Sequence, residues 1–228
     1  MTHVIRCVGA TRAFAIAGAA PIRAVDAVDL EVAPGEFIAI EGPSGSGKST
    51  LLGLLAGLDR ADAGSVTVLG HDLARLSQTE RARLRRSAMG IVFQAFGLVA
   101  SLSAGENVAL PLALDGIPAS VRRARAEAAL AGVGLDGFES ARIDELSGGE
   151  RQRVGVARAI VAEPALVLAD EPAGSLDDEH AARVLDLLQA ASRVGGASLV
   201  LVTHDPQSAT RADRRLRLRD GRLDADGR

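Results

Sequence analysis

One glycine-rich segment of the 228-residue chain has the residue types and the spacing of a phosphate-binding loop. Residues 42–49 read GPSGSGKS and fit the pattern G-x-x-x-x-G-K-[ST], between an expected strand and an expected helix. Glycines allow consecutive backbone N–H groups to converge on phosphate oxygens, and the start of a helix adds partial positive charge. Lys48 is the only lysine in the sequence and occupies the one position of the pattern that requires lysine. The residues predicted to bind nucleotide here are Gly42, Pro43, Ser44, Gly45, Ser46, Gly47, Lys48, Ser49 and Thr50.

Two adjacent acids follow a later apolar run. Asp170 and Glu171 come directly after residues 166–169, which read Leu-Val-Leu-Ala and are typical of a buried strand. Alone, the pair fits a solvated turn as well as a metal site. With a phosphate loop upstream, we predict that Ser49 and Asp170 hold Mg²⁺ and that Lys48 contacts the β- and γ-phosphates of ATP. Glu171 is then placed to act as the general base on the attacking water.

A second helix start also has the chemistry to bind an anion. Ser147, Gly148 and Gly149 offer a hydroxyl and unobstructed backbone amides just before an expected helix. Alone, the segment could be only a capped turn. It has no nucleotide motif of its own, so we interpret it as completing the site of another subunit.

The elements that must position these residues alternate between short strands and longer helices, which indicates an α/β fold. We expect one domain over 1–228, with a nucleotide-binding core of 1–93 and 160–228 and a helical subdomain of 94–159 that carries the second helix start. The core strands are expected at 36–40, 64–70, 89–93, 165–169 and 198–202, the helix after the phosphate loop at 48–58, and a hairpin at 216–221.

Composition excludes several classes of function. A net charge of −3 argues against a protein built mainly to hold nucleic acid, and the absence of Trp and Tyr removes most base-stacking platforms. No stretch of about 18 apolar residues is present, so we expect no membrane span. The single cysteine, Cys7, excludes an intramolecular disulfide. The arginines of 81–86 are expected to form a solvated helix face. Residues 13–20 imitate a secretion signal but are short and broken by glycine, so we expect a cytoplasmic chain.

Taken together, the motifs LSGGERQR, GPSGSGKST, LVLADEP and VTHD resemble those of ATP-binding-cassette (ABC) ATPases, the nucleotide-binding subunits of ABC transporters. The resemblance runs from Val25 to Leu223 in the family's motif order. It implies a P-loop NTPase (RecA-like) core with a mainly parallel sheet, an N-terminal antiparallel β region and an inserted α-helical subdomain. It also implies a head-to-tail dimer that holds two ATP and Mg²⁺ between each phosphate loop and the opposite Ser147–Gly149 segment.

The same resemblance assigns four further residues. Gln94 matches the glutamine that senses Mg²⁺ and the membrane partner, and Asp177 belongs to the loop Ser-Leu-Asp that couples subunits. His204 matches the histidine near the γ-phosphate, and Phe14 the aromatic residue that stacks on adenine. Three of the four have a simpler alternative: Phe14 in the core, Gln94 in a surface loop, His204 as an ordinary strand end.

Residues 93–99 and 106–112 are similar to the lipoprotein-release and macrolide-export ATPases. This similarity implies a separate integral membrane permease that contacts the region Gln94–Leu112, and therefore a position on the inner face of the cell membrane. The second ATPase subunit could be identical or different. Phe96, Leu98 and Val99 would form part of an apolar groove for the permease or, alternatively, part of the core of the helical insertion. Three other functions remain: a soluble ABC-type ATPase acting on nucleic acid or ribosomes, a small-molecule phosphoryl-transfer enzyme, and a regulatory cassette without turnover.

Overall fold

The computed structural model describes residues 2–16, 18–93, 97–174 and 176–225. The chain forms two compact units. Unit 1 comprises Met1–Arg85 and Ser198–Arg228, and unit 2 comprises Arg86–Ala197. The helix α2 (Gln78–Ala88) spans the boundary in sequence. In the described part of the chain, no helix is both long and apolar enough to cross a membrane.

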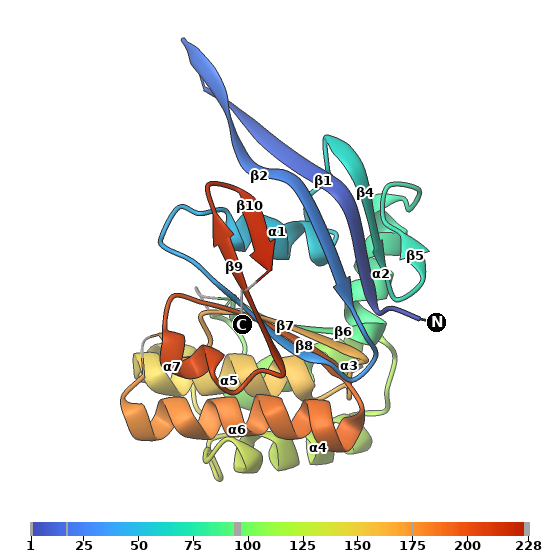
Figure 1. Ribbon diagram of the computed structural model, residues 1–228. Coiled ribbons are helices and arrows are strands. Elements are labelled where there is room, and N and C mark those ends of the chain that lie inside the picture. The colour runs from blue at the N-terminus through green and yellow to red at the C-terminus, as the bar shows by residue number, and fades with distance from the viewer. Residues whose placement is uncertain (1, 17, 94–96, 175, 226–228) are drawn as a thin grey trace. The chain divides into compact units, whose positions relative to one another are not determined.

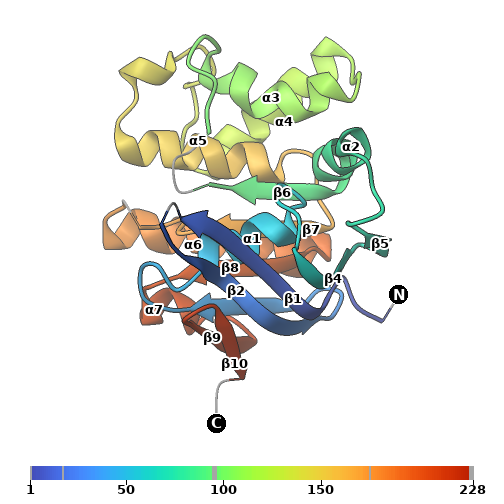
Figure 2. The ribbon, with the colours of Figure 1, turned by 90° about the horizontal axis from the view of Figure 1, so that it is seen from above.

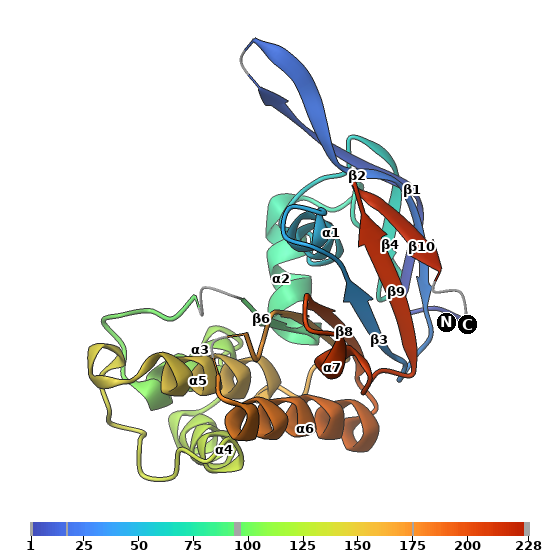
Figure 3. The same ribbon diagram turned by 60° about the vertical axis from the view of Figure 1, so that its left-hand side comes forward.

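Unit 1 begins with an antiparallel sheet in the strand order β2-β1-β4-β5. Its strands are β1 (Ile5–Ile16), β2 (Ala19–Val32), β4 (Ala63–Val68) and β5 (His71–Asp72). The strands β1 and β2 form a long hairpin whose tip extends past the end of β4 (Figures 1 and 3). This sheet is the predicted N-terminal antiparallel region, and residues 13–16 and 19–20 belong to its strands β1 and β2.

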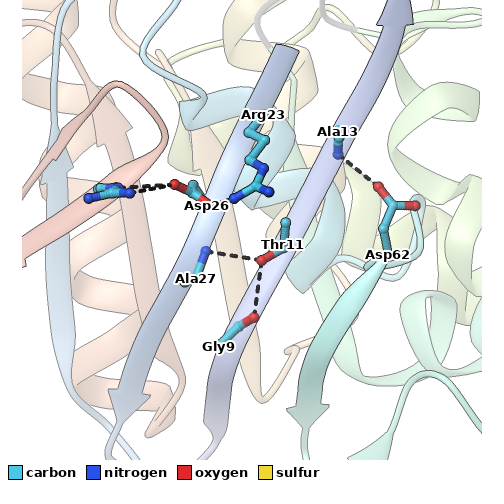
Figure 4. Close-up of polar contacts among 8 residues, drawn as sticks. Gly9, Thr11, Ala13, Arg23, Asp26, Ala27 and Asp62 are labelled. Atoms are coloured by element: carbon cyan, nitrogen blue, oxygen red, sulfur yellow. Dashed lines mark hydrogen bonds and ion pairs between the residues drawn. The ribbon is translucent and has the colours of Figure 1, made fainter. Parts of the chain in front are cut away.

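Local polar contacts shape the hairpin where its register shifts. The Thr11 hydroxyl accepts a hydrogen bond from the Ala27 N–H at 3.0 Å and donates one to the Gly9 carbonyl at 3.2 Å (Figure 4). Ala27 has a φ of 51°, a conformation uncommon for a residue with a side chain. The bulge is thus fixed by side-chain hydrogen bonds, as expected for a bend in an antiparallel pair.

A second sheet in unit 1 carries the phosphate loop. Its strands in this unit run in the order β10-β9-β3-β8, with β3 (Phe37–Glu41) parallel to β8 (Ser198–Thr203) and to β9 (Arg214–Arg219). The strand β10 (Arg222–Ala225) completes the expected hairpin with β9. The helix α1 (Lys48–Leu55) follows the loop, and the short α7 (Pro206–Ala209) follows β8. Both β3 and β8 are buried along nearly their whole length, which explains their continuous apolar sequences.

Two expectations for this unit are wrong. The helix after the phosphate loop ends at Leu55 rather than Leu58, because Gly57 has a φ of 63° and Leu58 is exposed. The arginines of α2 are not all solvated: Arg83 is exposed, but Arg81 is buried and the Arg85 guanidinium donates to the Gly57 carbonyl at 2.9 Å. Burial lowers the pKa of Arg85. Arg85 thus satisfies backbone carbonyls just after the end of α1.

In its described residues, unit 2 combines two parallel strands with the helices α3 to α6. The strand β6 (Met89–Val92) pairs with β7 (Leu166–Asp170). The helices α3 (Ala104–Leu114), α4 (Ala119–Gly132) and α5 (Gly148–Ile160) pack together (Figure 2), and α6 (Asp178–Gly195) contacts α5. A 3₁₀ turn, Ile143–Glu145, precedes α5. The segment 94–159, predicted to be helical, lies within this unit.

Candidate nucleotide-binding site

The phosphate loop of unit 1 connects β3 to α1 and encloses the lysine ammonium. Lys48 Nζ donates hydrogen bonds to the Gly42 carbonyl at 2.7 Å and the Pro43 carbonyl at 3.0 Å. The residue is 8% exposed although it carries a charge. A buried ammonium needs such partners, so the loop holds Lys48 in place before any phosphate arrives.

Two glycines of the loop are required by the fold. Gly47 has a φ of 102°, and a Cβ there would overlap the Ala24 carbonyl of β2. A Cβ at Gly42 would overlap the Leu218 carbonyl of β9. The loop is therefore pressed against the backbone of two strands and accepts no side chain at either position.

Apart from the buried Ser46, the remaining loop residues are exposed or lie at the start of α1. Ser44, Gly45 and Ser49 are exposed, and Thr50 is half-buried. The buried Ser46 hydroxyl has no hydrogen-bond partner among the described residues. An unsatisfied hydroxyl in a loop of this shape fits a ligand that supplies acceptor oxygens, as phosphate does.

His204 lies beside the phosphate loop. It follows β8 directly and is exposed. With Gly42 and Pro43 it lines a hollow of about 470 Å³, whose other lining residues are Glu41, Pro206, Arg217 and Arg219. The two arginines were not predicted, because their alternation in the sequence indicated only a hairpin. Asp205 caps α7 by accepting from the Gln207 and Ser208 N–H groups at 3.0 and 2.9 Å, which fixes the chain after His204.

Asp170 and Glu171 belong to unit 2. Asp170 ends β7 and is 8% exposed. Glu171 has a φ of 48°, and its carbonyl accepts from the Gly174 N–H at 3.2 Å in the following turn. A glutamate in the left-handed region is strained, and such strain gathers at functional sites. The structure therefore places two carboxylates in succession after a rigid buried strand.

The Ser147–Gly149 segment caps the N-terminus of α5, which is the simpler of the two interpretations of its sequence. One of its two glycines, Gly148, has no role in the fold of the described residues. Ser147 and Glu150 form a reciprocal capping box at the start of α5. These contacts with Ser147 lower the pKa of Glu150. A Cβ at Gly149 would press against Leu176, whereas Gly148 has a negative φ and meets no described atom within 4 Å. The fold of the described residues thus gives no reason for a glycine at 148.

Asp177 and Gln94 are the remaining site residues of unit 2 that the sequence predicted. Asp177 caps α6, accepting from the His180 N–H at 3.0 Å and contacting His180 Nδ1 at 2.7 Å. Its pKa is lowered, first by the backbone hydrogen bond and then by the His180 ring. Gln94 lies outside the described residues.

Phe14 is a surface residue of the β1–β2 hairpin. It pairs with Ile22 of β2 and is 42% exposed, so the alternative that placed it in the core is wrong. Two residues along β2 from Ile22, the Ala24 carbonyl lies against Gly47 of the phosphate loop. The ring is therefore carried on β1, and the strand paired with it, β2, lies against the loop.

Two residues that the sequence analysis missed hold the chain just after Gln94. Asn107 is fully buried on α3 and binds the Val99 backbone through both its Oδ1, at 2.8 Å, and its Nδ2, at 3.0 Å. Arg158 of α5 donates to the Gly97 carbonyl at 2.7 Å. Burial lowers the pKa of Arg158. The capping box formed by Ser103 and Glu106 marks the start of the helix that carries Asn107, and this was the sequence signal available for that residue. No local motif marks Arg158.

The described residues contain no cluster of three or more His, Cys, Asp or Glu that could hold a metal by themselves. The predicted ligands Ser49 and Asp170 lie in different units.

Comparison with known proteins gives consistent matches. The ABC transporter family model matches residues 25–174. The lipoprotein-releasing system ATP-binding protein LolD of Chromohalobacter salexigens is 43% identical over 223 residues, which cover 98% of this chain and 94% of LolD. The macrolide export ATP-binding/permease protein MacB of Azoarcus sp. is 43% identical over 99% of this chain, which spans only 34% of MacB.

A solved structure matches over nearly the whole chain. The dimeric, post-hydrolysis form of the ATP-binding cassette MJ0796, bound to ADP and Pi, has a TM-score of 0.92 and 34% identity, covering 98% of this chain and all of that one. The likeness confirms the predicted P-loop NTPase fold and the resemblance to ABC ATPases.

Proposed function

The chain belongs to the ABC transporter family, and we propose that it is an ATPase subunit that closes as a dimer around two Mg-ATP to drive a membrane permease. The observation that carries this proposal is the phosphate loop closed around Lys48, in which neither Gly42 nor Gly47 admits a side chain. Because the relatives are transporter subunits, the alternative of an ATPase acting on nucleic acid or ribosomes is not supported.

The proposed reaction is the attack of water on the γ-phosphorus of ATP. Glu171 takes a proton from the water as the bond to the β–γ bridging oxygen breaks, giving ADP and phosphate. Lys48 stabilises the charge that develops on the phosphate oxygens, and His204, beside the loop, contributes a donor on the same side. Mg²⁺ enters as part of the substrate, with Ser49, Asp170 and Gln94 as its proposed protein ligands.

The second half of each site is proposed to come from another copy. Ser147, Gly148 and Gly149 present a helix start that suits an anion, and Gly148 leaves an open surface that nothing described in the chain fills. The matched cassette MJ0796 was solved as a dimer. Asp177, at the exposed start of α6, is proposed to contact the second copy.

The permease contact is proposed for the region Gln94–Leu112. Asn107 of α3 binds Val99 and Arg158 of α5 binds Gly97, so a displacement of this part of the region by a permease would be transmitted to the helix that starts at Gly148. Val99 is 39% exposed in the same stretch and offers apolar surface. Since the relatives named above are a lipoprotein-releasing ATP-binding protein and a macrolide exporter, we place the chain at the inner face of the membrane with such a partner.

The test of the hydrolytic role is Glu171→Gln. We expect turnover to fall roughly 10²-fold or more, as for loss of a general base, while ATP affinity stays unchanged. Phosphate release measures the first quantity and calorimetric titration the second. Glu179→Gln, a change at an exposed acid on α6, is the matched control. Full turnover in Glu171→Gln would exclude Glu171 as the base.

A further inference from the structure

The ring of Phe14 already has a cation on one of its two faces. The Arg12 guanidinium carbon lies 4.8 Å from the ring centroid, within the range of a cation–π interaction. The Arg12 side chain is 25% exposed, while Phe14 is 42% exposed. One face of the ring is thus covered by the guanidinium, and a flat ligand must stack on the other.

Two carboxylates outside the hairpin hold the guanidinium in this position. Arg12 Nη1 donates to Asp62 Oδ1 at 2.9 Å, and Arg12 Nη2 lies 3.8 Å from Asp59 Oδ1. The other oxygen of Asp62 accepts the Ala13 N–H at 2.7 Å (Figure 4), so one carboxylate fixes both the backbone and the side chain before Phe14. The pKa of Asp62 is lowered, first by the Ala13 hydrogen bond and then by Arg12. The carboxylate is therefore ionised at neutral pH and available to Arg12.

The pairing of Phe14 within the β1–β2 hairpin shows how far the ring lies from the phosphate loop. Phe14 pairs with Ile22, and the Ala24 carbonyl, two residues or about 7 Å further along β2, touches Gly47. Ile22 is also exposed, so the strand pair presents two apolar side chains next to the loop. A nucleotide with phosphates in the loop would direct its base along this strand pair.

We propose that Arg12 is a positioning residue for nucleotide binding: held by Asp62 and Asp59, it fixes Phe14 so that a purine base stacks on the ring's open face. The inference rests on the proposed function, which supplies the nucleotide. A guanidinium behind the ring restricts its rotamers and polarises it, and both effects favour stacking. Arg12 itself does not touch the nucleotide, so its loss reduces the contribution of the base and leaves that of the phosphates.

The test compares Mg-ATP with Mg-tripolyphosphate, which has no base. We expect Arg12→Leu to weaken Mg-ATP binding about two- to five-fold and to leave tripolyphosphate binding unchanged, with Arg12→Lys recovering part of the loss. Arg6→Leu is the matched control, because Arg6 forms an exposed ion pair with Glu31 on the same strand, away from Phe14. A spectroscopic arm uses Phe14→Trp, the sole indole in a chain without Trp or Tyr. Mg-ATP should quench its fluorescence, and Arg12→Leu should reduce the quenching.

The outcomes separate the two proposals. Equal Mg-ATP affinity and equal quenching with and without Arg12 would overturn the positioning role while leaving the stacking of Phe14 intact. Weakened tripolyphosphate binding in Arg12→Leu, with a lower melting temperature, would also overturn it, since Arg12 would then only support the fold. If Mg-ATP binds but leaves the fluorescence of Phe14→Trp unchanged, base stacking on residue 14 and the inference both fail. Absence of any Mg-ATP binding to the unaltered chain would overturn the proposed function itself.

Discussion

The two helix starts that carry glycines, the phosphate loop of unit 1 and the Ser147–Gly149 segment of unit 2, differ in what requires their glycines. In the phosphate loop, the chain's own backbone lies against Gly42 and Gly47, and the loop carbonyls hold Lys48. At Gly148 the described chain leaves open space. The phosphate loop thus requires glycines because of contacts within the chain, whereas the open space at Gly148 leaves room for a partner outside the chain. The comparison therefore supports a site assembled from two copies.

The largest expected effect is on the loop itself. Gly47→Ala places a Cβ on the Ala24 carbonyl in a left-handed conformation, so the loop must shift and nucleotide binding should be lost. We expect the free energy of unfolding to fall by about 3 kcal/mol or more. Urea unfolding and calorimetric titration with Mg-ATP measure the two effects. Gly116→Ala is the control, because Gly116 has a similar φ of 76° but no described neighbour within 4 Å; it should cost only about 1 kcal/mol. Equal losses in both variants would show that backbone conformation, not close packing, sets the requirement.

Chemical modification of Lys48 is expected to have the next largest effect. Besides the N-terminus, Lys48 carries the only amine in the sequence, so an acylating reagent tests one side chain. Acylation removes the charge that faces the phosphates, and turnover should fall roughly 10²-fold. Mg-ATP should slow the modification, as followed by mass spectrometry. The Lys48→Arg variant, labelled only at the N-terminus, is the control. Loss of activity at the same rate with and without Mg-ATP would place the lysine away from the phosphates.

Gly148→Ala should separate stability from assembly. Because the described chain leaves room for the methyl group at the start of α5, stability should change by less than about 0.5 kcal/mol. Affinity for Mg-ATP in the monomer should also be unchanged. A methyl group between two copies should nevertheless lower turnover roughly ten-fold. Thermal melting and phosphate release measure these quantities. Unaltered turnover would mean that the open surface at Gly148 has no partner.

The smallest effect concerns pH and the hairpin contacts of Asp62. Its pKa is lowered in the folded chain from 3.8, so the carboxylate stabilises the fold above the unfolded pKa, and this contribution is lost as the pH falls through the folded pKa. Asp62→Asn should therefore be less stable than the unaltered chain at pH 7 and equally stable well below pH 3.8. Melting temperatures across this range measure the difference, with Asp224→Asn, a change at an exposed site on β10, as the control. A difference that persists undiminished in acid would assign the effect to packing.

Local motifs explain how much of this was predictable from the sequence. The phosphate loop, the paired acids and the buried strands are each encoded in consecutive residues, so their types and order were predicted. Contacts between distant segments were not. Arg81 and Arg85 were assigned to a solvated face because Gly57, which Arg81 lies beside and to which Arg85 donates, is more than twenty residues away. Likewise, Arg12 and Phe14 depend on Asp62, which lies 49 residues from Ala13.

The open space around Gly148 could likewise not be predicted from the sequence. The sequence shows a glycine in a helix start, but only the fold shows that no described part of the chain approaches it. The same holds for the left-handed conformation of Glu171, which follows from the turn after β7 rather than from its residue type. At both positions the residue type indicated the chemistry, whereas the local conformation and surroundings were visible only in the structure.

The most direct test of a site shared by two copies is the molar mass of Glu171→Gln by size exclusion with light scattering. In saturating Mg-ATP we expect a molar mass of twice the 23.4 kDa of one chain, and in Mg-ADP the mass of a single chain. A single-chain mass under both conditions, with Mg-ATP shown to be bound, would contradict closure of two copies of this chain around the nucleotide.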